Sequence, residues 1–131
     1  MKAYTDIEQS RKLAEILPKE TADMSYYIWK DDGHLMSPVP FVLDGTEVKE
    51  DGVFEYIPCW SLAALLDVLE SEIDGENGET YRLNIEKDGT WWDIWYSEEY
   101  NEENPIETTS SEELIDVCVD MIIKLKEMNL I

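Results

Sequence analysis

The chain has 131 residues, of which 44% are apolar, and its 31 acidic and 10 basic residues give a formal net charge of -21. A chain of this length normally forms one domain, and its five Trp and seven Tyr supply large side chains for a core, which excludes a disordered protein. A surface with this much negative charge repels nucleic-acid phosphates and anionic lipid head groups. We therefore expect no direct nucleic-acid binding and no membrane binding.

The beginning of the chain, from Met1 to Ile7, lacks the apolar segment of a signal peptide. Charged residues interrupt every apolar run before it reaches the ~20 residues that span a bilayer. Two cysteines, Cys59 and Cys118, are too few to form a disulfide framework. In the cytosol such cysteines are normally buried free thiols. We therefore expect a cytoplasmic protein in which residues 1–131 form a single domain.

The first elements are a helix and a strand. Thr5 and Glu8 fit a capping box at the start of a helix over Asp6 to Leu17, which Pro18 ends. The run from Met24 to Trp29 is rich in strand formers and is followed by turn residues, so it predicts a strand.

The middle of the chain predicts an irregular meander and a second helix. Pro58 suits the first turn of a helix, and leucines then recur at helical spacing, which predicts a helix over Pro58 to Ser71. The residues from Asp74 to Thr80 have the composition of a turn and lack the ligand order of a calcium-binding loop. Between His34 and Ile57, prolines and Asp-Gly turn pairs separate short segments that could pair: Phe41–Leu43, Glu47–Lys49 and Val53–Ile57.

Two alternating runs from Tyr81 to Tyr96 predict a β-hairpin around the turn pair Asp88-Gly89. A loop of two or four residues places two sets of side chains on opposite faces, because side chains alternate along a strand. The expected core face is Tyr81, Leu83, Ile85, Trp92, Ile94 and Tyr96, and the expected outer face is Arg82, Asn84, Glu86, Trp91, Asp93 and Trp95. A three-residue loop would bury the carboxylate of Asp93 among apolar residues, which is costly.

The last element is a long helix, capped by Thr109 or Ser110 and extending to Met128. Its apolar residues cover more than half of its circumference, so we expect it to lie against a sheet and a second helix. The order of elements predicts an α+β fold in which an antiparallel sheet of about four strands carries three helices mainly on one face.

Several stretches also carry a resemblance: Tyr4–Ser10 followed by Leu13–Pro18, then Pro58–Leu66, and Val117–Leu130 of the last helix. In these stretches the chain resembles a set of small uncharacterised acidic proteins encoded by gut anaerobic bacteria and by their phages or mobile elements. The resemblance implies an intracellular bacterial protein. It implies no activity, no cofactor and no site residues.

The sequence contains no phosphate-binding glycine loop, nucleophile elbow or metal-binding Cys and His pattern, so we predict no catalytic residues, no metal and no cofactor. His34, the only histidine, lies in a predicted turn and is expected to be solvated. Cys59 offers one enzymatic alternative, because a thiol in the first turn of a helix is stabilised as a thiolate. A following histidine that could act as its base is missing.

The outer face of the hairpin is the candidate site, because it combines Trp91 and Trp95 with Arg82, Glu86 and Asp93. Trp and Arg are enriched where protein partners bind most strongly. The alternative is a second small core, in which another part of the chain covers the two indoles. We therefore predict a non-enzymatic binding or regulatory protein with a basic protein partner. Two other hypotheses are an acidic nucleic-acid mimic that occupies a DNA- or RNA-binding protein, and a thiol enzyme that uses Cys59.

Overall fold

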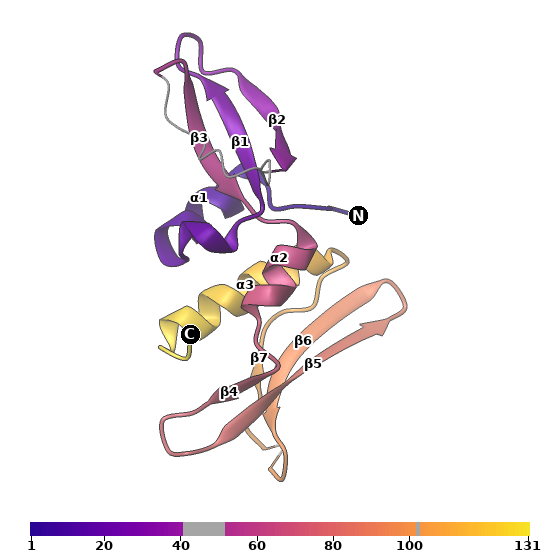
Figure 1. Ribbon diagram of the computed structural model, residues 1–131. Helices are drawn as coiled ribbons and strands as arrows, with labels where there is room; N and C mark the ends of the chain where they lie inside the picture. The colour runs from indigo at the N-terminus through magenta and orange to yellow at the C-terminus, as the bar shows by residue number, and fades with distance from the viewer. Residues whose placement is uncertain (41–51, 102) are drawn as a thin grey trace. The chain divides into compact units, whose positions relative to one another are not determined.

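The computed structural model describes residues 1–40, 52–101 and 103–131. The chain divides into two compact units, Tyr4–Ala64 and Leu65–Ile131, the latter joined by Met1–Ala3. Each unit contains one antiparallel sheet together with helices (Figure 1). The predicted α+β class is confirmed. We expected one sheet of about four strands, whereas the described residues form a three-stranded and a four-stranded sheet.

The first unit begins with helix α1 (Ile7–Ile16), which is capped by a capping box one residue later than predicted. The side chain of Asp6 accepts a hydrogen bond from the backbone N–H of Gln9 at 2.8 Å, and the Gln9 side chain accepts one from the N–H of Asp6 at 3.0 Å. Thr5 is buried instead, and its hydroxyl accepts a hydrogen bond from the backbone N–H of Trp60 at 3.1 Å. A short 3-10 helix, η1 (Lys19–Thr21), follows.

The sheet of this unit has the strand order β2-β1-β3. Its strands are β1 (Met24–Trp29), β2 (Leu35–Pro40) and β3 (Phe54–Cys59). One face of the sheet forms the core, in which buried Tyr26, Ile57 and Cys59 contact Ile7 of α1. Strand β1 confirms the predicted strand. The predicted segments Phe41–Leu43 and Glu47–Lys49 lie outside the described residues.

Proline explains where the sequence interpretation of this sheet differs from the structure. Pro58 was expected to begin a helix, but it lies inside β3 and pairs with Ser25. Strand β2 was not predicted, because it contains Pro38 and Pro40. Both strands pair only with β1 among the described residues, and proline is tolerated on such edge strands because the N–H it lacks is not needed for the ladder. Pro38 also lies where the pairing of β1 with β2 is irregular.

The boundary between the two units falls within helix α2 (Leu62–Val68), which is shorter than the predicted helix over Pro58 to Ser71. The residues after it form strand β4 (Glu72–Asp74). Ile73 fits the helical spacing of the preceding leucines, but in the structure it is a buried strand residue that pairs with Tyr81.

The second unit has a four-stranded sheet in the order β4-β5-β6-β7. Its other strands are β5 (Thr80–Asp88), β6 (Trp91–Glu98) and β7 (Ile106–Glu107). Helix α3 (Leu114–Glu127) packs against β6 (Figure 1). We call the face of the sheet to which the Ile94 side chain belongs the inner sheet face. The core of this unit contains buried residues of this face, of α3 and of the segment that includes the end of α2: Leu65, Leu69, Ile73, Ile94, Tyr96, Ile106, Leu114, Ile115, Val117, Cys118, Val119, Met121, Ile122 and Leu125.

Helix α3 begins at Leu114, later than predicted, because the residues before it bond to the sheet. The hydroxyl of Ser110 hydrogen-bonds to the carboxylate of Asp93, and the backbone of Ser111 forms a bridge with Trp92. The extent of the helix to its C-terminal end is as expected. Met1–Ala3 belongs to this unit, since the Lys2 ammonium lies 2.9 Å from Oδ1 of Asp116. No helix among residues 1–40, 52–101 and 103–131 is long and apolar enough to cross a membrane.

Candidate functional site

The register of the β5–β6 hairpin confirms the predicted division into two faces. Ile85 pairs with Ile94 and Asp88 pairs with Trp91, so the loop contains only Gly89 and Thr90. Directly paired residues of an antiparallel sheet share a face. The predicted core residues therefore lie on the inner sheet face, and the predicted outer residues lie on the opposite one, which we call the outer sheet face. With the residues added by β4, β7 and the rest of the hairpin, the outer sheet face consists of Glu72, Asp74, Thr80, Arg82, Asn84, Glu86, Asp88, Trp91, Asp93, Trp95, Ser97 and Glu107.

Burial along the inner sheet face is less uniform than expected. Ile94 and Tyr96 are buried, but Ile85 is 42% exposed and Trp92 is half-buried. Ile85 is exposed because α3 packs against β6, whereas Ile85 lies one strand away, on β5. Trp92 contacts Lys87, whose ammonium lies 5.2 Å from the centre of the indole ring.

The two indoles of the outer sheet face are not buried. Trp91 is 51% exposed, and Trp95 is half-buried where it pairs with Asn84 on one side and Glu107 on the other. Four residues along a strand correspond to about 13 Å, so the indoles lie at separate points of the face with Asp93 between them. A large, half-exposed aromatic side chain is the kind of residue that becomes buried when a partner binds.

Arg82 is held within the protein rather than left for a partner. Its guanidinium lies 3.4 Å from a carboxylate oxygen of Glu72 and 3.3 Å from one of Glu99. These pairs are about half exposed, and each such pair contributes roughly 0–1 kcal/mol to stability. Arg82 therefore lowers the negative charge at one end of the outer sheet face.

Glu86 and Asp93 form a like-charged pair near the loop end of the hairpin on this face. They are direct partners in the register, and Glu86 is exposed. Side chains at such positions have Cβ atoms about 4.5–5.5 Å apart, and like charges there repel each other. The hydroxyl of Ser110 donates a hydrogen bond to Asp93, which fixes the position of this carboxylate without neutralising it. A cation from outside the described chain would relieve the repulsion.

The outer sheet face carries more acid than the hairpin sequence alone predicted. Glu72 and Asp74 come from β4, and Glu107 comes from β7. They were missed because these strands are only three and two residues long. Two sequence signals could have indicated these strands: the alternation Glu-Ile-Asp around Ile73 and the pair Ile-Glu after Pro105.

Cys59 does not lie in the first turn of a helix, as the thiol hypothesis requires, but is the last residue of β3. Its side chain is fully buried, and its sulfur lies 3.6 Å from the hydroxyl of Thr5. Burial raises the pKa of this thiol, although hydrogen bonds with Thr5 and Ser10 act in the opposite direction. A buried thiol with a raised pKa is mostly protonated at neutral pH, so the geometry that motivated a nucleophile is missing.

His34 is exposed in the turn between β1 and β2, as predicted, and its backbone N–H donates a hydrogen bond to Asp32 at 2.9 Å. Within the described ranges, no group of three or more His, Cys, Asp or Glu residues could hold a metal ion. No protein-family model, curated protein or solved structure matches the chain.

Proposed function

We propose that this protein is a non-enzymatic binding or regulatory protein, such as an accessory or inhibitor factor, that contacts a basic protein partner through the outer sheet face. The observation that carries the proposal is the 51% exposure of Trp91 on a face whose register is fixed by the hairpin. Burying such an indole against a partner contributes apolar contact area, which dominates the energy of many interfaces.

The charge of the outer sheet face supports a basic partner. It contains one basic residue, Arg82, and the acidic residues Glu72, Asp74, Glu86, Asp88, Asp93 and Glu107. Complementary charge increases the rate of association and selects against acidic partners. We propose that a Lys or Arg of the partner binds near Glu86 and Asp93, where it relieves their repulsion and can contact an indole face.

From the sequence resemblance we infer that the protein acts in the cytoplasm of a bacterium, as a product of the bacterium itself or of a phage or mobile element. A regulatory partner in that setting would be a soluble protein of the host or of the element. An adjacent gene for a basic protein would supply the first candidate to test.

The test compares partner capture by three forms of the protein at low and at moderate salt. Replacement of both indoles, Trp91→Ala with Trp95→Ala, should weaken capture about 30-fold or more, the effect of losing one hot spot of about 2 kcal/mol. The matched control is Tyr100→Ala, which removes an aromatic side chain that is 94% exposed and lies outside the outer sheet face. The control should bind as well as the unmodified protein.

Two outcomes would contradict the proposal. A large loss of stability in the double Trp variant, measured by chemical denaturation, would mean that the indoles serve the core. Capture that falls steeply with salt but ignores the Trp substitutions would instead favour the nucleic-acid mimic, since charge alone would then determine binding.

A further inference from the structure

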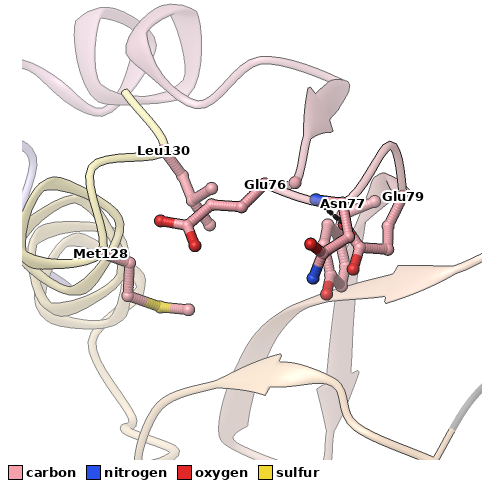
Figure 2. Close-up of a pocket in the computed structure, with 7 residues that line it drawn as sticks. Glu76, Asn77, Glu79, Met128 and Leu130 are labelled. Carbon is pink, nitrogen blue, oxygen red and sulfur yellow. Dashed lines mark hydrogen bonds between the residues drawn. The ribbon is translucent and has the colours of Figure 1, made fainter.

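A cavity of about 340 Å³ lies in the second unit, between the turn that joins β4 to β5 and the end of α3 (Figure 2). Its volume is at the lower end of the roughly 300–1,000 Å³ that small ligands occupy in proteins. The lining residues that the structure describes are Gly75, Glu76, Asn77, Glu79, Tyr81, Met128 and Leu130. The cavity shares no lining residue with the outer sheet face. Its lining residue from strand β5, Tyr81, lies on the inner sheet face.

The end of α3 supplies the apolar wall of this cavity. Asn129 has a φ of 57°, and the backbone N–H of Leu130 donates a hydrogen bond to the carbonyl of Leu125 at 2.9 Å. This is the pattern of a helix end that reverses through a left-handed residue. It turns the chain back after Met128, so that the side chains of Met128 and Leu130 both border the cavity (Figure 2).

The turn on the other side of the cavity depends on a glycine. The backbone N–H of Gly75 donates to the carbonyl of Glu79 at 2.8 Å, which closes the turn. A Cβ at Gly75 would lie 2.4 Å from Oε2 of Glu79 and 2.9 Å from the ring of Tyr81. Because glycine has no Cβ, the carboxylate of Glu79 and the ring of Tyr81 can approach the same point of the backbone.

Two carboxylates supply the charge of the cavity. The Glu79 carboxylate accepts a hydrogen bond from the backbone N–H of Asn77 at 2.9 Å, which holds it in place. The backbone N–H groups of Glu79 itself and of Asn77 lower the pKa of Glu79, so it is ionised at neutral pH. The Glu76 side chain extends toward Met128 and Leu130 (Figure 2). None of the seven lining residues named above is basic.

A ligand for this cavity therefore needs a cationic end and an apolar stem. We propose that the cavity binds a primary alkylammonium group, either a free aliphatic amine or the side chain of a lysine in a peptide. The aliphatic chain would pack on Met128, Leu130 and Tyr81, and the ammonium would lie between Glu76 and Glu79. A long amine buries its methylene groups on apolar surface while its head stays near charge and water, which matches this wall.

Titration by NMR with selectively labelled methionine methyl groups tests the proposal. The probes are n-pentylammonium and a short peptide with one central lysine and blocked ends, and n-pentanol is the uncharged control. We expect n-pentylammonium to shift the Met128 methyl signal and the amide signals of residues 75–81 in a saturable way. Pentanol should shift them less, because it lacks the charge that the two glutamates bind.

The matched variants are Glu76→Gln and Glu79→Gln, with Glu20→Gln as the control for loss of one negative charge elsewhere. Each of the first two should weaken binding about two- to five-fold, the range of one solvent-exposed ion pair, and the double variant about ten-fold. Glu20, which belongs to the first unit, does not line the cavity, so its replacement should leave binding unchanged.

The outcomes separate the source of the ligand from the existence of the site. Tighter binding of the peptide than of the free amine assigns the site to lysine side chains, and the reverse assigns it to small amines. The proposal is overturned if neither probe shifts the Met128 signal, if pentanol binds as well as the amine, or if the double variant binds normally. None of these results depends on Trp91 or Trp95, so this site and the proposed function can fail separately.

Discussion

Replacement of Tyr96 by Phe tests the register of the hairpin through the buried hydroxyl of the inner sheet face. The Tyr96 side chain is fully buried, and its hydroxyl donates a hydrogen bond to the backbone carbonyl of Glu70 at 2.7 Å. This bond ties the residues between α2 and β4 to the sheet. Its loss should reduce the free energy of unfolding by about 0.5–1.5 kcal/mol at pH 8, as is usual for one hydrogen bond.

The difference between the two proteins should depend on pH. Burial, followed by the charges of Glu70 and Cys118, raises the pKa of Tyr96 from 10.0 to about 12 in the folded state. Since the folded pKa is the higher one, the unfolded protein releases this proton first. The stability contribution is complete below pH 10 and is lost between pH 10 and about pH 12. At pH 11, one unit above the unfolded pKa, the unmodified protein should have lost about 1.4 kcal/mol that the Phe variant keeps.

Urea unfolding at pH 8 and at pH 11 measures this effect. Tyr26, Cys59 and Cys118 also have raised pKa values, but both proteins contain them, so the comparison isolates Tyr96. We expect the advantage of the unmodified protein at pH 8 to disappear or to reverse at pH 11. An unchanged difference at the two pH values would mean that the hydroxyl is not buried. The register, and with it the exposed position of Trp91, would then be wrong.

Three further predictions concern local contacts. Asp6→Ala should lower the free energy of unfolding by about 1 kcal/mol in thermal unfolding, because it removes the side-chain cap of α1. Thr5→Ser keeps the hydroxyl that bonds to the Trp60 backbone, so it should destabilise the protein less. Cys59 and Cys118 are both fully buried with raised pKa values, so mass spectrometry should detect alkylation by iodoacetamide at neutral pH only after unfolding; rapid reaction of native Cys59 would revive the thiol hypothesis. Gly75→Ala should displace the Glu79 carboxylate and weaken pentylammonium binding, because a Cβ at Gly75 would lie 2.4 Å from Oε2 of Glu79. Unchanged binding in an NMR titration would contradict this.

The hairpin was predictable from the sequence because its signals agree with one another. Alternation along both strands, the Asp-Gly turn and the cost of burying Asp93 all favour one register, and the structure has that register. The long helix was predictable for the same reason, since its apolar stripe is uninterrupted. The hairpin supplies most of the outer sheet face, including Trp91 and Trp95.

The remaining differences come from tertiary contacts that override local preference. Pro58 and the following leucines fit a helix, but the pairing of Pro58 with Ser25 places it in an edge strand. Ile73 fits the same helical spacing and instead fills the core as a strand residue. The cavity lined by Glu76 and Leu130 joins segments that are far apart in the chain, and neither segment alone contains a recognisable motif.

The prolines of the three-stranded sheet also limit how this protein can associate with other chains. Pro38 and Pro40 lie in one outer strand and Pro58 lies in the other, so each outer strand lacks at least one backbone donor. An added strand needs a continuous ladder of such donors, and natural proteins use proline at these positions to prevent aggregation. Recognition by strand addition is therefore disfavoured at the described edges of this sheet.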